Sequence, residues 1–142
     1  SGLRYQFQDK CWNPLPAPRN GEGKELTLTG ATAMLAVSPD GEAQIICAGG
    51  VNHDVFWDAI SGTYSKVAQA DYLKKDISWY QFNGCPLTYK LKTERWEFLS
   101  HQTPLLARAG AQVAMRKHTL YYIGGELKPG LRSPGIVQLD LR

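Results

Sequence analysis

The sequence has no long apolar run and no strong excess of either charge. Its 142 residues contain no stretch near the roughly 18 consecutive apolar residues that a membrane-spanning helix needs. The 16 Lys and Arg residues nearly balance 13 Asp and Glu, and the densest basic clusters are only pairs such as Lys74-Lys75. We therefore expect no membrane partner and no nucleic-acid partner.

Cysteines are also few and widely spaced. Cys11, Cys47 and Cys85 form no Cys-x-x-Cys pair and no cysteine–histidine spacing typical of zinc sites, so we expect no metal. An odd count in so short a chain argues against a disulfide framework. Cys47 lies in an apolar segment and is expected to be a small core residue.

A short pattern occurs twice in the chain. The hydrophobic run and Gly-Gly pair of residues 45–50 match those of residues 120–125. Each copy is preceded by a segment of small residues, 30–34 in one and 110–114 in the other. β-Branched and aromatic residues favour strands, and glycines permit the backbone torsions that end them. The pattern therefore predicts two related pairs of strands.

A second repeated feature is a Tyr separated from a Trp by six residues. Tyr5 precedes Trp12 in this way, and Tyr89 precedes Trp96. Gly-Gly after one strand, followed by Tyr and Trp, is the pattern of kelch repeats, which fold as four-stranded propeller blades of roughly 50 residues. The sequence therefore predicts an all-β, kelch-type β-propeller.

The spacing of these features divides the chain into about two blades. We expect residues 1–20 to supply the closing strand of one blade, 30–100 to form a complete blade, and 105–142 to form most of the next. Closed propellers contain about 4 to 8 blades. The rest of the ring is therefore expected from a longer chain, which the start at Ser1 without a Met favours, or from other subunits.

The complete blade contains an insertion at residues 51–83. Within it, residues 67–72 are predicted to form a helical turn or two. Long loops on rigid scaffolds often carry function. The alternative is that the aromatic residues of the insertion only build a small satellite core, and we expect this for most of them. These residues are Phe56, Trp57, Trp79, Tyr80 and Phe82.

The loop after the second Gly-Gly pair carries a carboxylate and a guanidinium, Glu126 and Arg132. In a regular two-residue hairpin these side chains would point to opposite faces. Pro129-Gly130 favours a type II turn, which fits the twist of tight hairpins poorly. We therefore expect a wider, irregular loop, with a simple Glu–Arg surface pair as the alternative.

Several further residues near the strand ends are candidates. We take Asn52, two positions after Gly50, as the counterpart of Glu126, which directly follows Gly125, and expect both side chains at one mouth of the propeller. The adjacent His53-Asp54 suggests an alternative acid/base pair, although neighbouring residues on an extended chain point apart. The roles of Arg19, Arg108 and Lys128 stay open, Lys128 being either a second substrate anchor or a solvated lysine.

These motifs resemble those of the bacterial N-acetylneuraminate epimerase (sialic acid mutarotase) family. The similarity runs from about Ala31 to Arg142, and its most specific part is Gly-Glu-x-Lys-Pro-Gly-x-Arg at residues 125–132. The resemblance implies a six-bladed kelch propeller that interconverts the α and β anomers of sialic acid without a cofactor. It also implies a periplasmic location if the protein follows the Gram-negative members.

For this reaction we expect Glu126 and Arg132 to be catalytic, and Arg132 and Asn52 to bind the substrate. Anomer exchange needs a proton taken from the anomeric hydroxyl and one given to the ring oxygen. One carboxyl can do both, and Arg132 could hold the carboxylate of the sugar acid.

Two departures affect the substrate. Gln81, Gly84 and Pro86 stand where bulkier residues are usual in the family, and the related cyclically permuted mutarotases share these motifs. A mutarotase for another sugar is therefore an alternative. A non-catalytic kelch module that binds a protein or glycan is a second, and a hydrolytic sialidase is a weaker third.

Overall fold

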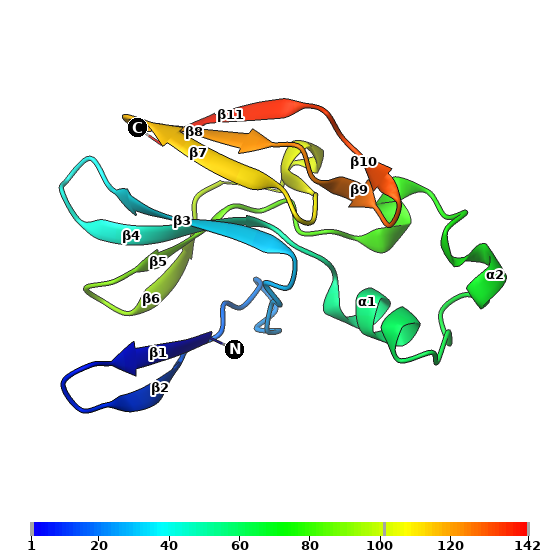
Figure 1. Ribbon diagram of the computed structural model, residues 1–142, viewed down its shortest axis with the longest axis horizontal. Helices are drawn as coiled ribbons and strands as arrows, with labels where there is room; N and C mark the ends of the chain where they lie inside the picture. Colours follow the sequence, from blue (N-terminus) through cyan, green and yellow to red (C-terminus); the bar gives the residue numbers. More distant parts are fainter. Residues whose placement is uncertain (1, 101, 142) are drawn as a thin grey trace.

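A computed structural model of the chain describes residues 2–100 and 102–141. Nearly all of its regular structure is antiparallel β-sheet. The sheets are small and separate, and the three larger groups of strands lie one above another in the view of Figure 1. The hairpin turns of the sheets lie at one side of the molecule, and the helices and the β9–β10 hairpin lie at the other (Figure 1). Long connections therefore gather at one end of the strands.

The central sheet has four strands in sequence order. Its strands are β3 (Ala31–Val37), β4 (Ala43–Gly49), β5 (Leu87–Lys90) and β6 (Arg95–Phe98). Each strand pairs antiparallel with the next. This is the sheet expected of one complete propeller blade.

The next sheet repeats this plan with three strands. It is formed by β7 (Gln112–Arg116), β8 (Thr119–Ile123) and β11 (Ile136–Asp140), with β8 in the centre. The two predicted pairs of strands, each of which precedes a Gly-Gly pair, are therefore confirmed as β3 with β4 and β7 with β8. The connection between β8 and β11 holds a separate hairpin of β9 (Glu126–Lys128) and β10 (Leu131–Arg132).

The N-terminal segment differs from expectation. Where we predicted one closing strand, two paired strands occur, β1 (Gly2–Gln6) and β2 (Cys11–Leu15). Tyr5 lies directly opposite Trp12 with ring centroids 5.1 Å apart, as Tyr89 lies opposite Trp96 at 5.0 Å. The repeated Tyr–Trp spacing therefore marks a pair of rings across a hairpin.

The insertion between β4 and β5 is helical. It contains α1 (His53–Ile60), α2 (Gln69–Tyr72) and the 3-10 helix η1 (Ile77–Tyr80), and a second 3-10 helix, η2 (Pro104–Leu106), precedes β7. The helical turn predicted within 67–72 is confirmed. We did not predict α1, which follows Asn52, a residue type that favours the start of a helix.

The aromatic residues of the insertion form the predicted satellite core in most cases. Tyr80 and Phe82 are buried with Val51 and Val55, and Phe56 and Trp79 pack against them. Trp57 is an exception, because it is exposed and stacks on His53. The insertion is therefore a packed unit with its own apolar centre.

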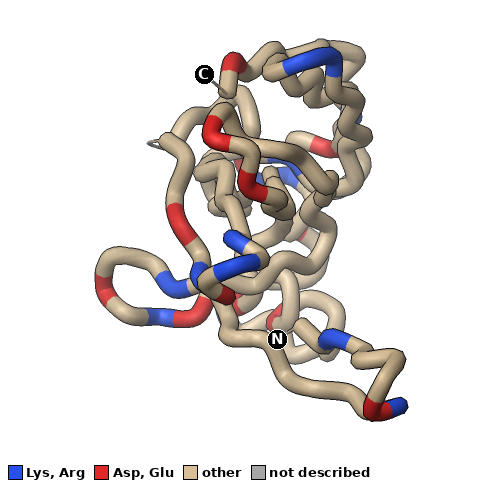
Figure 2. The backbone as a smooth tube through the Cα atoms, turned by 90° about the vertical axis from the view of Figure 1, so that its left-hand side faces the viewer, with Lys and Arg blue, Asp and Glu red and all other residues tan. Residues whose placement is uncertain are grey.

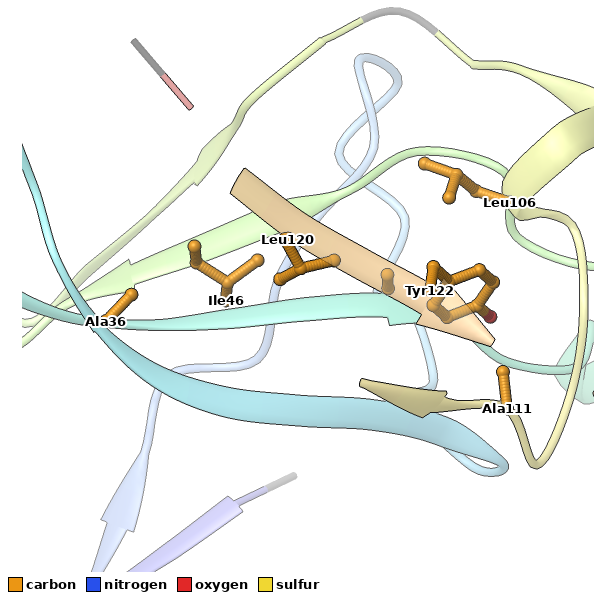
Figure 3. Close-up of a cluster of buried hydrophobic side chains, with 7 residues drawn as sticks. Ala36, Ile46, Leu106, Ala111, Leu120 and Tyr122 are labelled. Atoms are coloured by element: carbon orange, nitrogen blue, oxygen red, sulfur yellow. The ribbon is translucent and has the colours of Figure 1, made fainter. Parts of the chain in front are cut away.

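The main core lies between the two larger sheets. Its buried side chains come chiefly from facing strands β4 and β8 and are Ala36, Ile46, Ala48, Leu106, Ala111, Leu120 and Tyr122 (Figure 3). Cys47, by contrast, is buried outside this cluster, and burial raises the pKa of its thiol to about 11. Face-to-face packing of neighbouring sheets is the arrangement by which propeller blades bury apolar surface.

Charged residues are distributed over both strands and loops. Basic and acidic positions are interspersed along the chain, and segments of one sign are short (Figure 2). Within the described residues, no helix has the length and apolar composition to cross a membrane.

Candidate functional site

The hairpin β9–β10 brings Glu126 and Arg132 opposite each other. Its two-residue turn, Pro129-Gly130, joins Lys128 to Leu131, and Gly130 has a φ of +79°, as the third residue of a type II turn requires. The wider loop that we expected is therefore wrong. Register nevertheless shifts after Leu131, so that Arg132 pairs with Glu126.

The register shift resolves the conflict between turn type and twist. Leu131 pairs with Lys128, and the next residue of β10, Arg132, pairs with Glu126. Leu127 therefore has no partner on β10 and is the extra residue of a bulge. A bulge strengthens local twist and compensates a turn that fits a hairpin poorly. It also moves Glu126, in place of Leu127, opposite Arg132.

The two side chains form an ion pair that leaves the guanidinium accessible. Arg132 Nε lies 3.6 Å from Glu126 Oε1, and the side chains are 85% and 36% exposed. An exposed pair at this distance contributes only ~0–1 kcal/mol to stability. The arginine therefore keeps most of its donor groups free to bind an anion.

The backbone at Glu126 is fixed from the neighbouring segment. The Glu126 N–H donates to the Ala109 carbonyl at 2.8 Å, and the Ala109 N–H donates to the Glu126 carbonyl at 2.9 Å. Ser133 N–H donates to the Gly125 carbonyl at 2.8 Å. The base of the hairpin is thus closed by backbone hydrogen bonds on both sides of the acid.

A buried arginine supports the same base from behind. Arg108 is 6% exposed, and its Nη1 donates to the carbonyls of Gly124 at 2.9 Å and Gly135 at 3.0 Å. Its Nε is buried without a partner among the described residues. Arg108, whose role the sequence left open, therefore clamps both ends of the loop that carries β9 and β10.

The prediction that Asn52 is the counterpart of Glu126 in the repeat is wrong by one residue. Val51 N–H donates to the Thr29 carbonyl at 2.9 Å, as the Glu126 N–H donates to that of Ala109. The partner of Glu126 in the repeat is therefore the buried Val51, and Asn52 corresponds to Leu127. The carboxylate thus stands where the first blade has an apolar side chain.

Asn52 begins helix α1. Its side-chain oxygen accepts a hydrogen bond from the Val55 N–H at 3.1 Å, and its amide nitrogen lies 3.4 Å from Gln81 Oε1. It lines an open cleft of about 700 Å³, together with residues of the loop 20–27 and of the segment 81–85. Neither Glu126 nor Arg132 lines this cleft within the described residues.

The other candidates near Asn52 pair with one another. Lys24 Nζ donates to Asp54 Oδ2 at 2.6 Å, and His53 Nδ1 lies 3.3 Å from Asp54 Oδ1. These hydrogen bonds hold the pKa of the Asp54 carboxyl below its usual range, and the one from Lys24 has the larger effect. Arg19 forms an exposed ion pair with Glu25 at 2.6 Å.

Lys128 has partners that the sequence did not indicate. Its ammonium group donates to the carbonyls of Leu73 at 3.1 Å and Lys75 at 2.6 Å in the insertion. Across residues 2–100 and 102–141, no cluster of three or more His, Cys, Asp or Glu side chains is arranged to hold a metal ion.

Comparison with known protein families gives one match over nearly the whole chain. A family model described as N-acetylneuraminate epimerase matches residues 2–142. The N-acetylneuraminate epimerase of Escherichia coli O9:H4 (strain HS) is 32% identical over 101 residues, which are 65% of this chain and 27% of that relative. Those of E. coli K12 and Shigella flexneri are 30% identical over 100 residues, with the same coverage.

The solved structure of YjhT is similar to this chain, with a TM-score of 0.72 and 26% sequence identity. The match covers 98% of this chain and 40% of the YjhT chain. The predicted all-β, kelch-type propeller fold is thereby confirmed, with the described sheets as part of a ring. The chain spans 27% of the length of the curated relatives it matches.

Proposed function

Because the chain belongs to the N-acetylneuraminate epimerase family, we propose that it contributes the reacting carboxylate to an enzyme that interconverts the α and β anomers of N-acetylneuraminate. In this proposal Glu126 and Arg132 are catalytic, and Arg132 and Asn52 bind the sugar acid. The rest of the propeller is supplied by a longer chain or by other subunits.

Glu126 is proposed to carry out both proton transfers of ring opening. Its carboxylate takes the proton of the anomeric hydroxyl and, as the resulting carboxylic acid, gives that proton to the ring oxygen while the bond between this oxygen and the anomeric carbon breaks. The ketone group of the open-chain sugar then rotates about the carbon–carbon bond that joins it to the rest of the sugar. Ring closure on the opposite face of the ketone reverses the two transfers and leaves Glu126 ionised again, so no cofactor is consumed.

Arg132 is proposed to bind the carboxylate of the sugar. Its guanidinium is 85% exposed and touches Glu126 through Nε at 3.6 Å, so its terminal N–H groups are available for two parallel hydrogen bonds to a carboxylate. Such a contact would also keep the two carboxylates from repelling each other near the reacting atoms.

The observation that carries the proposal is the bulge at Leu127. A regular hairpin would separate Glu126 from Arg132, since successive side chains alternate between faces. The bulge instead makes them direct neighbours, at a half-buried position that an apolar residue occupies in the other blade.

NMR magnetisation exchange between the two anomers of N-acetylneuraminate tests the proposal in the protein's native assembly. We expect Glu126→Gln to reduce the enzymatic exchange rate by about 100-fold or more, a typical contribution of general acid–base catalysis. Glu97→Gln, at an exposed site on β6, is the matched control and should leave the rate unchanged. A wild-type assembly that leaves exchange at its spontaneous rate would overturn the proposal.

A non-catalytic sugar-binding module is the second candidate. The open cleft of about 700 Å³ at Asn52 favours it, because this cleft lies apart from Glu126 in the described residues. Calorimetric titration with N-acetylneuraminate separates the two functions. Binding that survives Glu126→Gln while exchange is lost supports the enzyme, whereas wild-type binding without accelerated exchange supports the module.

A further inference from the structure

The tip of the β9–β10 hairpin is attached to the helical insertion by one side chain. Lys128 is the last residue of β9, and its ammonium group reaches the carbonyls of Leu73 and Lys75, more than fifty positions earlier in the chain. These are the only contacts between charged groups and backbone carbonyls that join the two segments in the part of the chain the structure describes.

The acceptors of Lys128 lie at the C-terminal end of helix α2 and just beyond it. Leu73 is the C-cap of α2, and Lys75 follows two residues later. The last carbonyls of a helix lack partners within it, and a lysine is a favourable donor at this end. The contact thus satisfies backbone acceptors and at the same time commits two of the three ammonium donors.

The insertion offers a firm attachment point. Tyr72 and Trp79 pack edge to face with ring centroids 6.0 Å apart, and Tyr80, which is buried, lies 5.4 Å from Tyr72. The Tyr80 hydroxyl donates to the Tyr72 carbonyl. Lys75 also lies 5.8 Å from the centroid of the Trp79 ring.

The hairpin gains from such an attachment because its own strand pairing is short. Its base is fixed at Ala109 and Arg108, but β10 contains only two residues, and an isolated two-stranded hairpin is marginally stable in water. Glu126 and Arg132 lie between the fixed base and the tip. Motion of the tip would therefore change the geometry of the pair.

We infer that Lys128 is a positioning residue, which ties the β9–β10 hairpin to the insertion and thereby holds Glu126 and Arg132 in their mutual geometry. The inference rests on the proposed function for its catalytic consequence. It replaces both earlier interpretations of Lys128, because an ammonium group committed to two carbonyls is neither a substrate anchor nor a free surface lysine.

The test compares Lys128→Met with Lys74→Met in the native assembly. Met keeps the length of the side chain and removes its donors. Lys74 is the matched control, since it lies in the same segment, is 72% exposed, and contacts only Asp71 among the described residues. Two readouts are used: amide hydrogen exchange of residues 126–133, and kcat and KM for anomer exchange.

We expect Lys128→Met to speed hydrogen exchange in the hairpin by about tenfold, as a local opening becomes easier. We also expect kcat to fall by about tenfold with KM changed less than twofold, because small displacements of reacting groups are costly. Lys128→Arg, which retains a cation and several donors, should restore most of both. Lys74→Met should change neither readout.

Three results would overturn the inference. Unchanged hydrogen exchange with a raised KM would make Lys128 a substrate contact. Faster hydrogen exchange with unchanged kcat would make the contact purely structural, and no change in either readout would remove its role. Hydrogen exchange needs no turnover, so an inactive wild-type assembly would reject the proposed function while this readout still decides whether Lys128 holds the hairpin.

Discussion

Gly49 borders the hydroxyl group of Tyr122, and a side chain on Gly49 would overlap it. A Cβ at this position would also overlap the Arg108 carbonyl oxygen, which accepts a hydrogen bond from the Tyr122 hydroxyl at 3.2 Å. Burial raises the pKa of Tyr122 to about 12, so the hydroxyl remains a donor at neutral pH. The first Gly-Gly pair thus makes room for a contact with the next blade.

Gly49→Ala should be strongly destabilising. The substitution combines a positive φ of +77° with overlap against a buried phenol and the backbone, for a loss of more than ~3 kcal/mol in unfolding free energy. Gly62→Ala is the matched control, because Gly62 has the same φ of +77° and open space around it. Urea denaturation should show a loss of only ~1–2 kcal/mol there. Equal losses in both variants would show that the close approach to Tyr122 is unimportant.

Arg108→Met should weaken the base of the β9–β10 hairpin. It removes two hydrogen bonds from a charged donor, each contributing ~1.5–3 kcal/mol, but it also relieves the burial of an unpaired charge, so we expect a net loss of ~2 kcal/mol. Arg116→Met, at an exposed position on β7, should stay within ~0.5 kcal/mol of wild type. An unchanged urea midpoint for Arg108→Met would mean that the two glycine carbonyls do not need the guanidinium.

Asp58 should make the insertion sensitive to acid. The Ser65 hydroxyl, at 2.5 Å, and the Lys66 N–H, at 3.0 Å, donate to its carboxylate and hold the pKa of Asp58 below its usual value. The stabilisation is therefore present above an unfolded pKa of ~3.9 and is lost as pH falls through the lower folded pKa. Asp58→Asn should reduce the loss of thermal stability between neutral pH and pH ~3. An acid profile of Asp58→Asn equal to that of wild type would contradict this role.

Gly130→Ala should loosen the hairpin tip without a steric clash. Gly130 has a φ of +79°, and no heavy atom lies within 4 Å of the place that a Cβ would take. Only the backbone conformation is therefore penalised, by ~1 kcal/mol. Gly21→Ala is the control, since Gly21 also has open surroundings but no positive φ. We expect faster amide exchange in residues 126–132 for Gly130→Ala alone. Protection that is unaffected there would indicate a different turn.

The sequence predicted those features of the fold that depend on local patterns. The repeated Gly-Gly pairs marked the ends of β4 and of the strand equivalent to it, β8, and the Tyr–Trp spacing marked rings that face each other across hairpins. Such patterns are readable because strand periodicity and glycine torsions act within a few residues.

Features of the site that depend on long-range contacts were not predictable in the same way. The bulge at Leu127 arises from a balance between turn and twist, and the partners of Lys128 and Arg108 lie in segments far from them or across a loop. Helix α1 was not predicted although Asn52 is a favourable N-cap, because the helix depends on packing of Val55 into the satellite core, which the local sequence does not show.

A double-mutant cycle on the rate of anomer exchange tests most directly whether Glu126 and Arg132 act as one unit. NMR magnetisation exchange would be measured for the wild-type assembly, Glu126→Gln, Arg132→Met and the double variant. We predict that the double variant is no slower than Glu126→Gln by more than about threefold, because groups that act as a unit are not additive. Losses that multiply, or a wild-type rate equal to the spontaneous one, would contradict a functional pair created by the bulge.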